Sequence, residues 1–238
     1  MHEAIDRIVS PVLDSVAREI GPRFAAVLYG SAARGEHLAA VSDVNLLLVL
    51  DTLRPEALRR LSAALKAFRA GEQTPPLLLE RDEWQRAVDV FPIEVTDMQL
   101  AHESLRGEDP VGGLVVDPAD LRRALEQEFR GKLLRLRQAY ALNAADPGNL
   151  GIVAGRTVSS VATLFRVALR LHGRPVPADT PGCLTAARAA MGVATGPVAE
   201  LWGRRGQDGA CTPELFEGYL AAVAAAVRVI DQFTPGGN

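Results

Sequence analysis

The chain has 238 residues, of which 48% are hydrophobic and 23% are charged, and its formal net charge is -3. This balance is ordinary for a globular protein, and the lack of a basic surplus argues against a long nucleic-acid partner. A small anionic ligand bound with a metal ion needs no such surplus. The two cysteines, Cys183 and Cys211, lie far apart without metal-binding spacing, so the pattern supports neither a zinc site nor a disulfide scaffold.

The N-terminal residues 1–10 mix charged and apolar side chains and contain no apolar core of a signal peptide. No run of apolar residues is judged long enough to cross a membrane. We therefore expect a soluble, cytoplasmic protein that does not act at a membrane.

The first half of the chain alternates helical and strand patterns. Apolar residues at helical spacing predict a helix over residues 3–20, which ends at Gly21-Pro22. Short apolar runs predict buried strands at Phe24–Tyr29 and Val44–Leu50. The other elements expected in this half are a helix over 55–69, a short strand at 77–79, a short helix at 81–88 and a third strand at 91–96. Pro92 indicates either that this third strand lies at a sheet edge or that the proline stands at the start of the strand.

The second half of the chain reads as helical. Asp117-Pro118 predicts an N-cap followed by proline at the first helical position, and an apolar stripe continues to Tyr140. Three more helices are expected over 149–172, 181–191 and 213–233, and a loop at 202–206. Thr180-Pro181 and Thr212-Pro213 repeat the signal of a cap residue followed by proline and open the last two of these helices. The Gly-, Pro- and Asp-rich segment 106–118 predicts a domain boundary. The fold class expected is α/β (α+β), with an N-terminal domain over 1–110 and a C-terminal helical bundle over 117–238.

The turn that follows the first strand is a candidate phosphate site. Gly30 allows a sharp turn, and Ser31 is expected to begin a short helix. A helix start attracts phosphate oxygens because its first N–H groups are unpaired. Ser31 adds a hydroxyl donor, and Arg34 lies one turn further on, where its charge would offset that of a phosphate. The alternative is a strand, turn and helix that serve folding alone, since neither a GxGxxG motif nor a P-loop lysine is present.

The second strand is preceded by a candidate metal ligand. Residues two apart on a strand share a face, so Asp43 and Asn45 are expected to face the turn together. Carboxylate oxygens are the ligands that Mg²⁺ prefers, and the ion neutralises phosphate charge during phosphoryl transfer. Asn45 offers a carbonyl oxygen but no charge. In the alternative interpretation Asn45 only forms a hydrogen bond with Asp43 or with the turn.

Residues 30–45, with GSAARG followed by SDVN, resemble the nucleotidyltransferase superfamily that includes DNA polymerase beta and the aminoglycoside nucleotidyltransferases. The pattern of that superfamily is Gly-Ser, a gap of about ten residues, and then Asp-x-Asp or Asp-x-Glu. Only position 45 departs from the pattern. The resemblance implies the nucleotidyltransferase fold, with ATP or another nucleoside triphosphate as co-substrate and Mg²⁺ as cofactor.

The segment EFRGKLLRLR, residues 128–137, resembles the helix of kanamycin nucleotidyltransferase-like enzymes that carries a catalytic Glu followed by Gly and Lys. Glu128 and Lys132 are four residues apart and share a helix face. The resemblance implies that Glu128 is the general base, that Lys132 binds phosphate, and that a homodimer completes the site. The alternative is an ordinary surface ion pair on a helix, in which Gly131 costs about 1 kcal/mol relative to Ala.

A third carboxylate is usual in the superfamily on a later strand. Glu94 is the candidate, because on the expected strand Ile93 and Val95 would face the core and Glu94 the opposite side. Asp97 has the wrong parity for that face.

Two functions remain. In the first, the protein transfers a nucleoside monophosphate from a nucleoside triphosphate to a hydroxyl group of a small molecule. In the second, it is a catalytically inactive nucleotide-binding or regulatory module of the same fold, because Asn45 removes one metal-binding charge.

Overall fold

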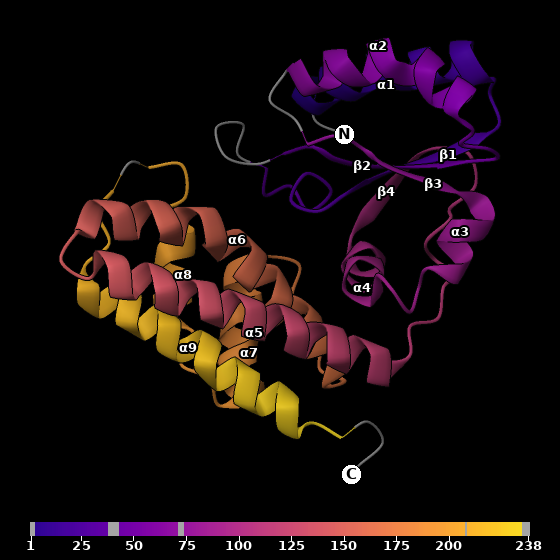
Figure 1. Cartoon of the computed structure of the whole chain (residues 1–238). Helices are drawn as coiled ribbons and strands as arrows, with labels where there is room; N and C mark the ends of the chain where they lie inside the picture. The colour runs from indigo at the N-terminus through magenta and orange to yellow at the C-terminus, as the bar shows by residue number, and fades with distance from the viewer. Residues whose placement is uncertain (1–2, 38–42, 71–73, 208, 235–238) are drawn as a thin grey trace. The chain divides into compact units, whose positions relative to one another are not determined.

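The computed structural model describes residues 3–37, 43–70, 74–207 and 209–234 (Figure 1). The contacts within the chain divide it into two compact units. We call them the sheet unit, Met1–Val90 with Met98–Val115, and the helical unit, Phe91–Asp97 with Val116–Asn238. The protein is therefore a mixed α/β chain with a helical C-terminal part.

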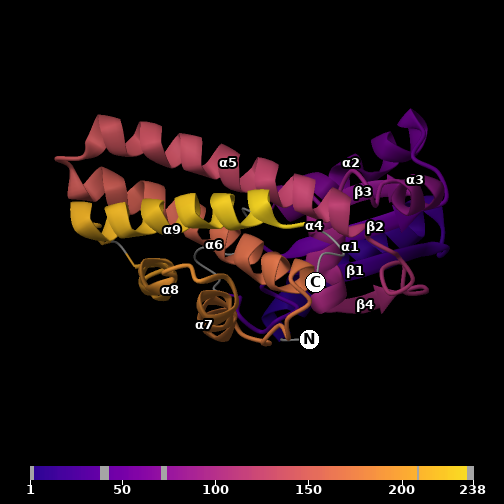
Figure 2. The ribbon, with the colours of Figure 1, turned by 90° about the horizontal axis from the view of Figure 1, so that it is seen from below.

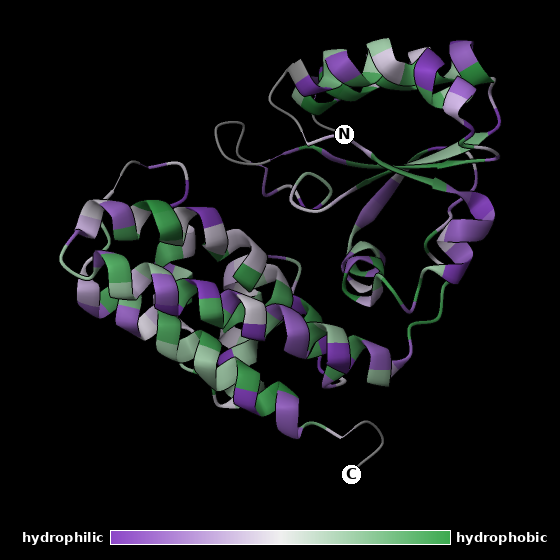
Figure 3. Cartoon of the chain, in the orientation of Figure 1, coloured by the Kyte–Doolittle hydropathy of each residue, from purple (hydrophilic) through white to green (hydrophobic). Residues whose placement is uncertain are grey.

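The sheet unit contains a mixed sheet of four strands in the order β3-β2-β1-β4. The strands are β1 Phe24–Tyr29, β2 Asn45–Leu50, β3 Leu77–Glu80 and β4 His102–Arg106. Strand β1 pairs antiparallel with both β2 and β4, whereas β2 and β3 are parallel. The apolar runs that predict β1 and β2 lie in the centre of this sheet, and both strands are drawn in hydrophobic colours in Figure 3.

One face of the sheet is covered by α1 (Glu3–Ile20) and α2 (Pro55–Ala70), which pack on each other (Figure 1). Alternate residues of β1 and β2 enter the core beneath these helices, because side chains two apart on a strand share a face. The core residues from the two strands are Phe24, Ala26, Leu28, Leu46, Leu48 and Leu50. Tyr29 and Asn45 are out of phase with this set and therefore belong to the opposite face.

The third strand expected at 91–96 is wrong. This segment forms a helix, α4 (Pro92–Leu100), which follows the short helix α3 (Arg81–Arg86). Pro92 stands at the first helical position, where its missing N–H costs nothing, and Val95 N donates to Phe91 O at 3.0 Å. The apolar pattern of this stretch fits both periods over six residues, so periodicity alone does not separate helix from strand. The strand that pairs with β1 on the side away from β2 is β4, which was not predicted.

The helical unit is formed mainly by five helices. They are α5 Pro118–Asn143, α6 Pro147–Leu171, α7 Thr180–Met191, α8 Gly196–Gly203 and α9 Pro213–Gln232. Helix α5 packs on α6 and α9, and α6 also packs on α7 and α8 (Figure 2). Helix α8 was not predicted, and its last turn includes part of the segment expected to be a loop, which begins only after Gly203.

The helix starts follow the predicted caps, with one shift. Asp117 accepts from Ala119 N at 2.7 Å, and Thr212 accepts from Leu215 N at 3.3 Å. At α7 the cap is Asp179, which accepts from Gly182 N at 2.7 Å, and not Thr180. The side chain of Thr180 is buried and accepts from Arg166 instead.

Helix α6 is long and apolar enough to cross a membrane, so the expectation that no such run exists is wrong by length and composition. More than half of its most apolar window is buried within the structure. It contributes more buried side chains to the helical core than any other described helix, from Leu150 to Leu171. Its apolar composition is therefore explained by its place at the centre of the helical unit.

The first half of α4 belongs to the helical unit through two contacts. Ile93 is part of the helical core. Asp97 is buried, and its Oδ1 lies 3.7 Å from Nη1 of Arg166, a residue of α6 that is 1% exposed. Nη2 of Arg166 donates to Thr180 Oγ1 at 2.6 Å. This buried network holds residues 91–97 to α6 and α7.

Candidate functional site

The segment after β1 is a hydrogen-bonded turn and not the short helix that was expected. Arg34 N donates to Gly30 O at 3.2 Å, and Glu36 N donates to Ser31 O at 2.9 Å. Gly35 has a φ of +72°, which ends the helical path after one turn. We call residues 30–37 the β1 turn. A single turn aligns only a few peptide groups, so the β1 turn lacks the dipole that the expected helix would have had.

Gly30 and Asn45 lie against each other at one end of the sheet. Tyr29 and Asn45 are paired residues of β1 and β2, so the next residue, Gly30, comes beside the Asn45 side chain. A Cβ at Gly30 would stand 2.5 Å from Nδ2 of Asn45. Gly30 also has a φ of +74°. The left-handed backbone conformation therefore favours glycine at this position, and a Cβ would also displace the end of the Asn45 side chain.

We expect the substitution Gly30→Ala to destabilise the chain by about 1–3 kcal/mol, because it adds a left-handed backbone strain and a contact with Asn45. Urea unfolding measures the loss. Gly35→Ala is the matched control, since Gly35 has a similar φ but no atom within 4 Å of its Cβ position. Equal losses for the two variants would mean that the Asn45 side chain moves aside freely.

Asp43 precedes β2, and its side chain is exposed. The hydroxyl of Thr74, just before the parallel neighbour β3, donates to Oδ2 of Asp43. The same end of the sheet thus presents the β1 turn, Asp43 and Thr74. Sequence reasoning missed Thr74, because its approach depends on the pairing of β2 with β3, which lies far along the chain.

Arg34 is held within the β1 turn. Its Nε donates to Oε2 of Glu36 at 3.2 Å, and the two side chains are only 8% and 11% exposed. Glu36 therefore offsets the charge of Arg34. Ser31 is half-buried and directly follows Gly30, so its hydroxyl and the nearby N–H groups are the main donors that the β1 turn offers.

A histidine joins this end of the sheet through β4. His102 pairs with Tyr29, which in turn pairs with Asn45, so the three residues form a row across β4, β1 and β2. His102 Nε2 lies 3.1 Å from Asp109 Oδ1, and its Nδ1 lies 2.8 Å from Met98 O. Desolvation acts to raise the pKa of Asp109, but the Val111 N–H and the charge of His102 outweigh it and lower this pKa. The polar sequence of β4 gave little strand signal, and for that reason His102 was missed.

Glu94, Glu128 and Lys132 belong to the helical unit. Glu94 lies in the first turn of α4, so the expectation that it stands on a later strand is wrong. Desolvation of its carboxylate, and then the charges of Glu128 and Asp97, raise the pKa of Glu94, although much of the residue's surface is exposed. The two glutamates are therefore electrostatic neighbours, on α4 and α5.

Lys132 lies one turn after Glu128 on α5 and is half-buried. Desolvation and the charge of Arg135 lower the pKa of Lys132, and the charge of Glu128 acts in the opposite direction. Gly131 is open: a Cβ there would meet only the end of the Arg135 side chain, at 3.5 Å. Within the described part of the chain, no close contact with another helix requires glycine at this position.

The raised pKa of Glu94 predicts a pH-dependent effect of Glu94→Gln. Because the folded pKa lies above the unfolded value of 4.5, ionised Glu94 destabilises the fold at neutral pH, and this penalty disappears as the pH falls below 4.5. We therefore expect Glu94→Gln to stabilise the protein at pH 7 and to have no effect on stability in acid. Urea unfolding across pH measures this.

The matched control for Glu94→Gln is Glu126→Gln, which has the opposite sign. Hydrogen bonds from Arg130 and Arg122 lower the pKa of Glu126, so its loss should destabilise the protein at neutral pH. A stabilisation by Glu94→Gln that stays constant down to acid pH would contradict the electrostatic cause.

The donor set near the β1 turn suits a magnesium ion that arrives with a triphosphate. Mg²⁺ in nucleotide sites is usually held by one or two carboxylates, with phosphate oxygens and water completing its shell. The turn end of the sheet offers the Asp43 carboxylate and the Asn45 amide. Among the described residues, no three His, Cys, Asp or Glu side chains gather into a metal-binding group. These residues fit a metal shared with a ligand better than a metal held by protein groups alone.

Comparison with known proteins identified no relative of this chain. Neither a scan against protein-family models nor a search of curated protein sequences gave a match to this chain.

Proposed function

We propose that this protein belongs to the nucleotidyltransferase superfamily and transfers a nucleoside monophosphate from ATP or another nucleoside triphosphate to a hydroxyl group of a small molecule. The observation that carries the proposal is the contact between Gly30 and Asn45. It joins the two halves of the Gly-Ser and Asp-x-Asn motif at one end of β1 and β2, with Asp43 two residues before Asn45.

In the proposed reaction, the Ser31 hydroxyl and the N–H groups of the β1 turn donate to phosphate oxygens and orient the triphosphate. Asp43 and the carbonyl oxygen of Asn45 would hold Mg²⁺, which when bound neutralises charge on the phosphates. Thr74 orients the Asp43 carboxylate through its hydrogen bond. Arg34 supports the turn through its ion pair with Glu36. Because Glu36 offsets its charge, Arg34 would attract phosphate less strongly than an unpaired arginine.

Glu128, from this chain or from a second copy, would accept the proton of the acceptor hydroxyl as that oxygen attacks the α-phosphorus. The bond between the α-phosphorus and the bridging oxygen breaks, and pyrophosphate leaves. Lys132 would bind a phosphate oxygen as a compact charge. A homodimer and a cytoplasmic location belong to the same proposal.

A second candidate is a nucleotide-binding or regulatory module that does not transfer. It is favoured by the position of Asn45, whose amide nitrogen is directed at Gly30 and which brings no negative charge. Loss of one of two metal-binding carboxylates removes stabilisation of the charge that develops in the transition state.

The test is a transfer assay with labelled ATP, Mg²⁺ or Mn²⁺ and a panel of hydroxylated small molecules. The proteins are the native chain, Asp43→Ala and Asn45→Asp. Asp51→Ala is the matched control, because Asp51 directly follows the other end of β2 and, among the described residues, forms only long surface ion pairs with Arg23 and Arg81.

Native turnover that is abolished in Asp43→Ala and kept in Asp51→Ala supports the enzyme. Transfer by Asn45→Asp alone identifies the native chain as the binding module. If neither the native chain nor Asn45→Asp binds a nucleotide, both candidate functions are rejected.

A further inference from the structure

The segment that follows β4 is the covalent link from the sheet unit to α5, and it is folded back onto α3 and α4. We call residues 107–115 the β4–α5 connection. The indole Nε1 of Trp84, on α3, donates to Pro110 O at 2.9 Å. The amide of Gln99, on α4, donates to Leu114 O at 2.7 Å. Both contacts are made by neutral side chains, so neither changes with pH.

His102 makes a third contact with this connection, and its charge can change. Its Nδ1 lies 2.8 Å from Met98 O, and its Nε2 lies 3.1 Å from Oδ1 of Asp109. A carbonyl oxygen and an ionised carboxylate can only accept hydrogen bonds. A neutral imidazole has one N–H and one lone pair, so it satisfies one of these oxygens and turns a lone pair toward the other. Only the protonated ring donates to both.

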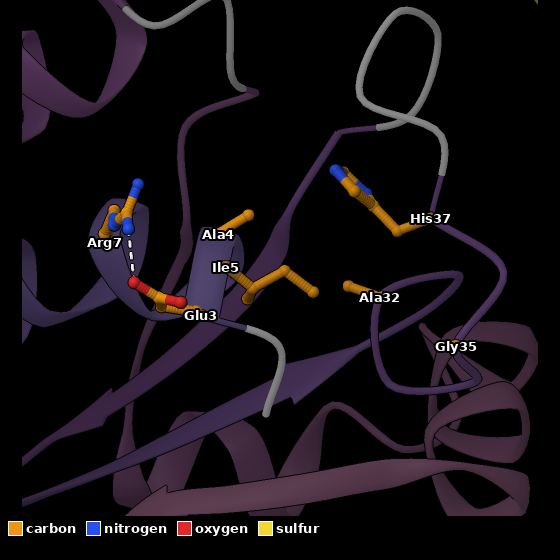
Figure 4. Close-up of a pocket in the computed structure, with 7 residues that line it drawn as sticks. All are labelled: Glu3, Ala4, Ile5, Arg7, Ala32, Gly35 and His37. Atoms are coloured by element: carbon orange, nitrogen blue, oxygen red, sulfur yellow. Dashed lines mark hydrogen bonds and ion pairs between the residues drawn. The ribbon is translucent and has the colours of Figure 1, made fainter.

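The other described histidines lack such a pair of acceptors. His37 lies in the β1 turn beside the start of α1 (Figure 4), and its Nδ1 is buried without a hydrogen-bond partner. Nε2 of His172, which follows α6, is buried without a partner as well. The two acceptors that face the ring are therefore particular to His102.

Asp109 is the group through which the ring acts on the connection. Its carboxylate also accepts from Val111 N at 2.8 Å and from Gly112 N at 3.2 Å, so one side chain closes a tight turn and binds the ring. Desolvation acts to raise the pKa of Asp109, but the Val111 N–H and the charge of His102 outweigh it and bring this pKa below 3.8. The carboxylate is therefore ionised in mildly acidic solution.

The neighbouring titratable groups do not supply a second anion to the ring. Across the sheet His102 is paired with Tyr29, and a phenol as a rule ionises only near pH 10. Glu103 is the next residue on β4 and lies on the other face of the strand. On α4 the nearby charge is Asp97, which is paired with Arg166.

We propose that His102 and Asp109 form a pH-sensitive latch, which holds the β4–α5 connection on the sheet unit while the ring is protonated and releases the connection when the proton is lost. Histidine is the side chain that ordinarily changes charge between pH 5 and 8. The latch is therefore closed in mildly acidic solution and opens as the pH rises. The neutral contacts of Trp84 and Gln99 persist, so the turn at Asp109 loosens without unfolding of the sheet unit.

Amide hydrogen exchange of Val111, expressed as protection relative to the intrinsic rate at each pH, tests the latch. In the native chain we expect this protection to fall about fivefold between pH 5 and pH 8, a modest change because Asp109 is 41% exposed. His102→Gln should show the low protection at both pH values. His37→Gln is the matched control, because it removes a histidine elsewhere in the sheet unit, and it should keep the native pH dependence.

Equal protection of Val111 at the two pH values in the native chain would overturn the latch. A pH dependence that persists in His102→Gln, or in Asp109→Asn, would overturn it as well. Nitrogen NMR of the native histidine side chains gives a reading that needs no variant. We expect both ring nitrogens of His102 to carry protons at pH 5, and a neutral ring in the folded chain at that pH would reject the proposal.

Discussion

Replacement of Glu128 by Gln is expected to slow the transfer of the nucleoside monophosphate by about 10²- to 10⁴-fold, the usual range for loss of a general base. Gln keeps the size of the side chain but accepts no proton. Nucleotide binding should be unaffected, because Glu128 is proposed to contact the acceptor hydroxyl and not the phosphates. Single-turnover rates with saturating ATP measure the effect on the chemical step.

Glu126→Gln is the control for this variant. Glu126 stands half a turn earlier on α5 and is paired with Arg122 and Arg130, so its loss should affect stability but not the transfer rate. A rate reduced less than about threefold by Glu128→Gln would remove Glu128 from the mechanism and favour the ordinary helix ion pair instead.

The second large effect is expected at Asp97. Asp97→Ala should destabilise the helical unit by about 3 kcal/mol, since removal of one partner of a buried ion pair leaves a desolvated charge behind. The remaining charge is Arg166, which is 1% exposed. Urea unfolding followed by circular dichroism reports the loss.

Asp231→Ala is the matched control for Asp97→Ala. Asp231 pairs with Arg130 at 3.2 Å, but the two side chains are 53% and 50% exposed, so the expected loss is below about 1 kcal/mol. A similar small loss for Asp97→Ala would show that Arg166 is stabilised by its other contacts.

The elements with long, regular patterns could be predicted from the sequence. Helix α1 was predicted from its apolar stripe, and α5 and α9 from a cap residue followed by proline. Short or polar elements could not be predicted. The six residues from Phe91 fit either period, and β4 has only one apolar residue, Leu105, so neither gave a usable signal.

The candidate site was predictable only where residues are close in sequence. The spacing from Gly30 to Asn45 was enough to expect them to be neighbours, and the pairing of β1 with β2 confirms it. Thr74 and His102 reach the same end of the sheet through pairings that no local pattern encodes. The position of Glu94 was predicted wrongly, because the prediction depended on a strand at 91–96 that does not form.

The division of α4 between the two units has a practical consequence for dissecting the protein. A fragment that begins at Val116 would contain most of the helical unit but would lack Ile93 from its core and Asp97 beside Arg166. Cutting the chain in the Gly- and Pro-rich segment should therefore give a C-terminal piece that folds poorly. A piece that begins before Phe91 retains both contacts. If protease cleavage near 107–113 leaves the two pieces associated, the contacts of residues 91–97 with the helical unit are enough to hold them without an intact chain.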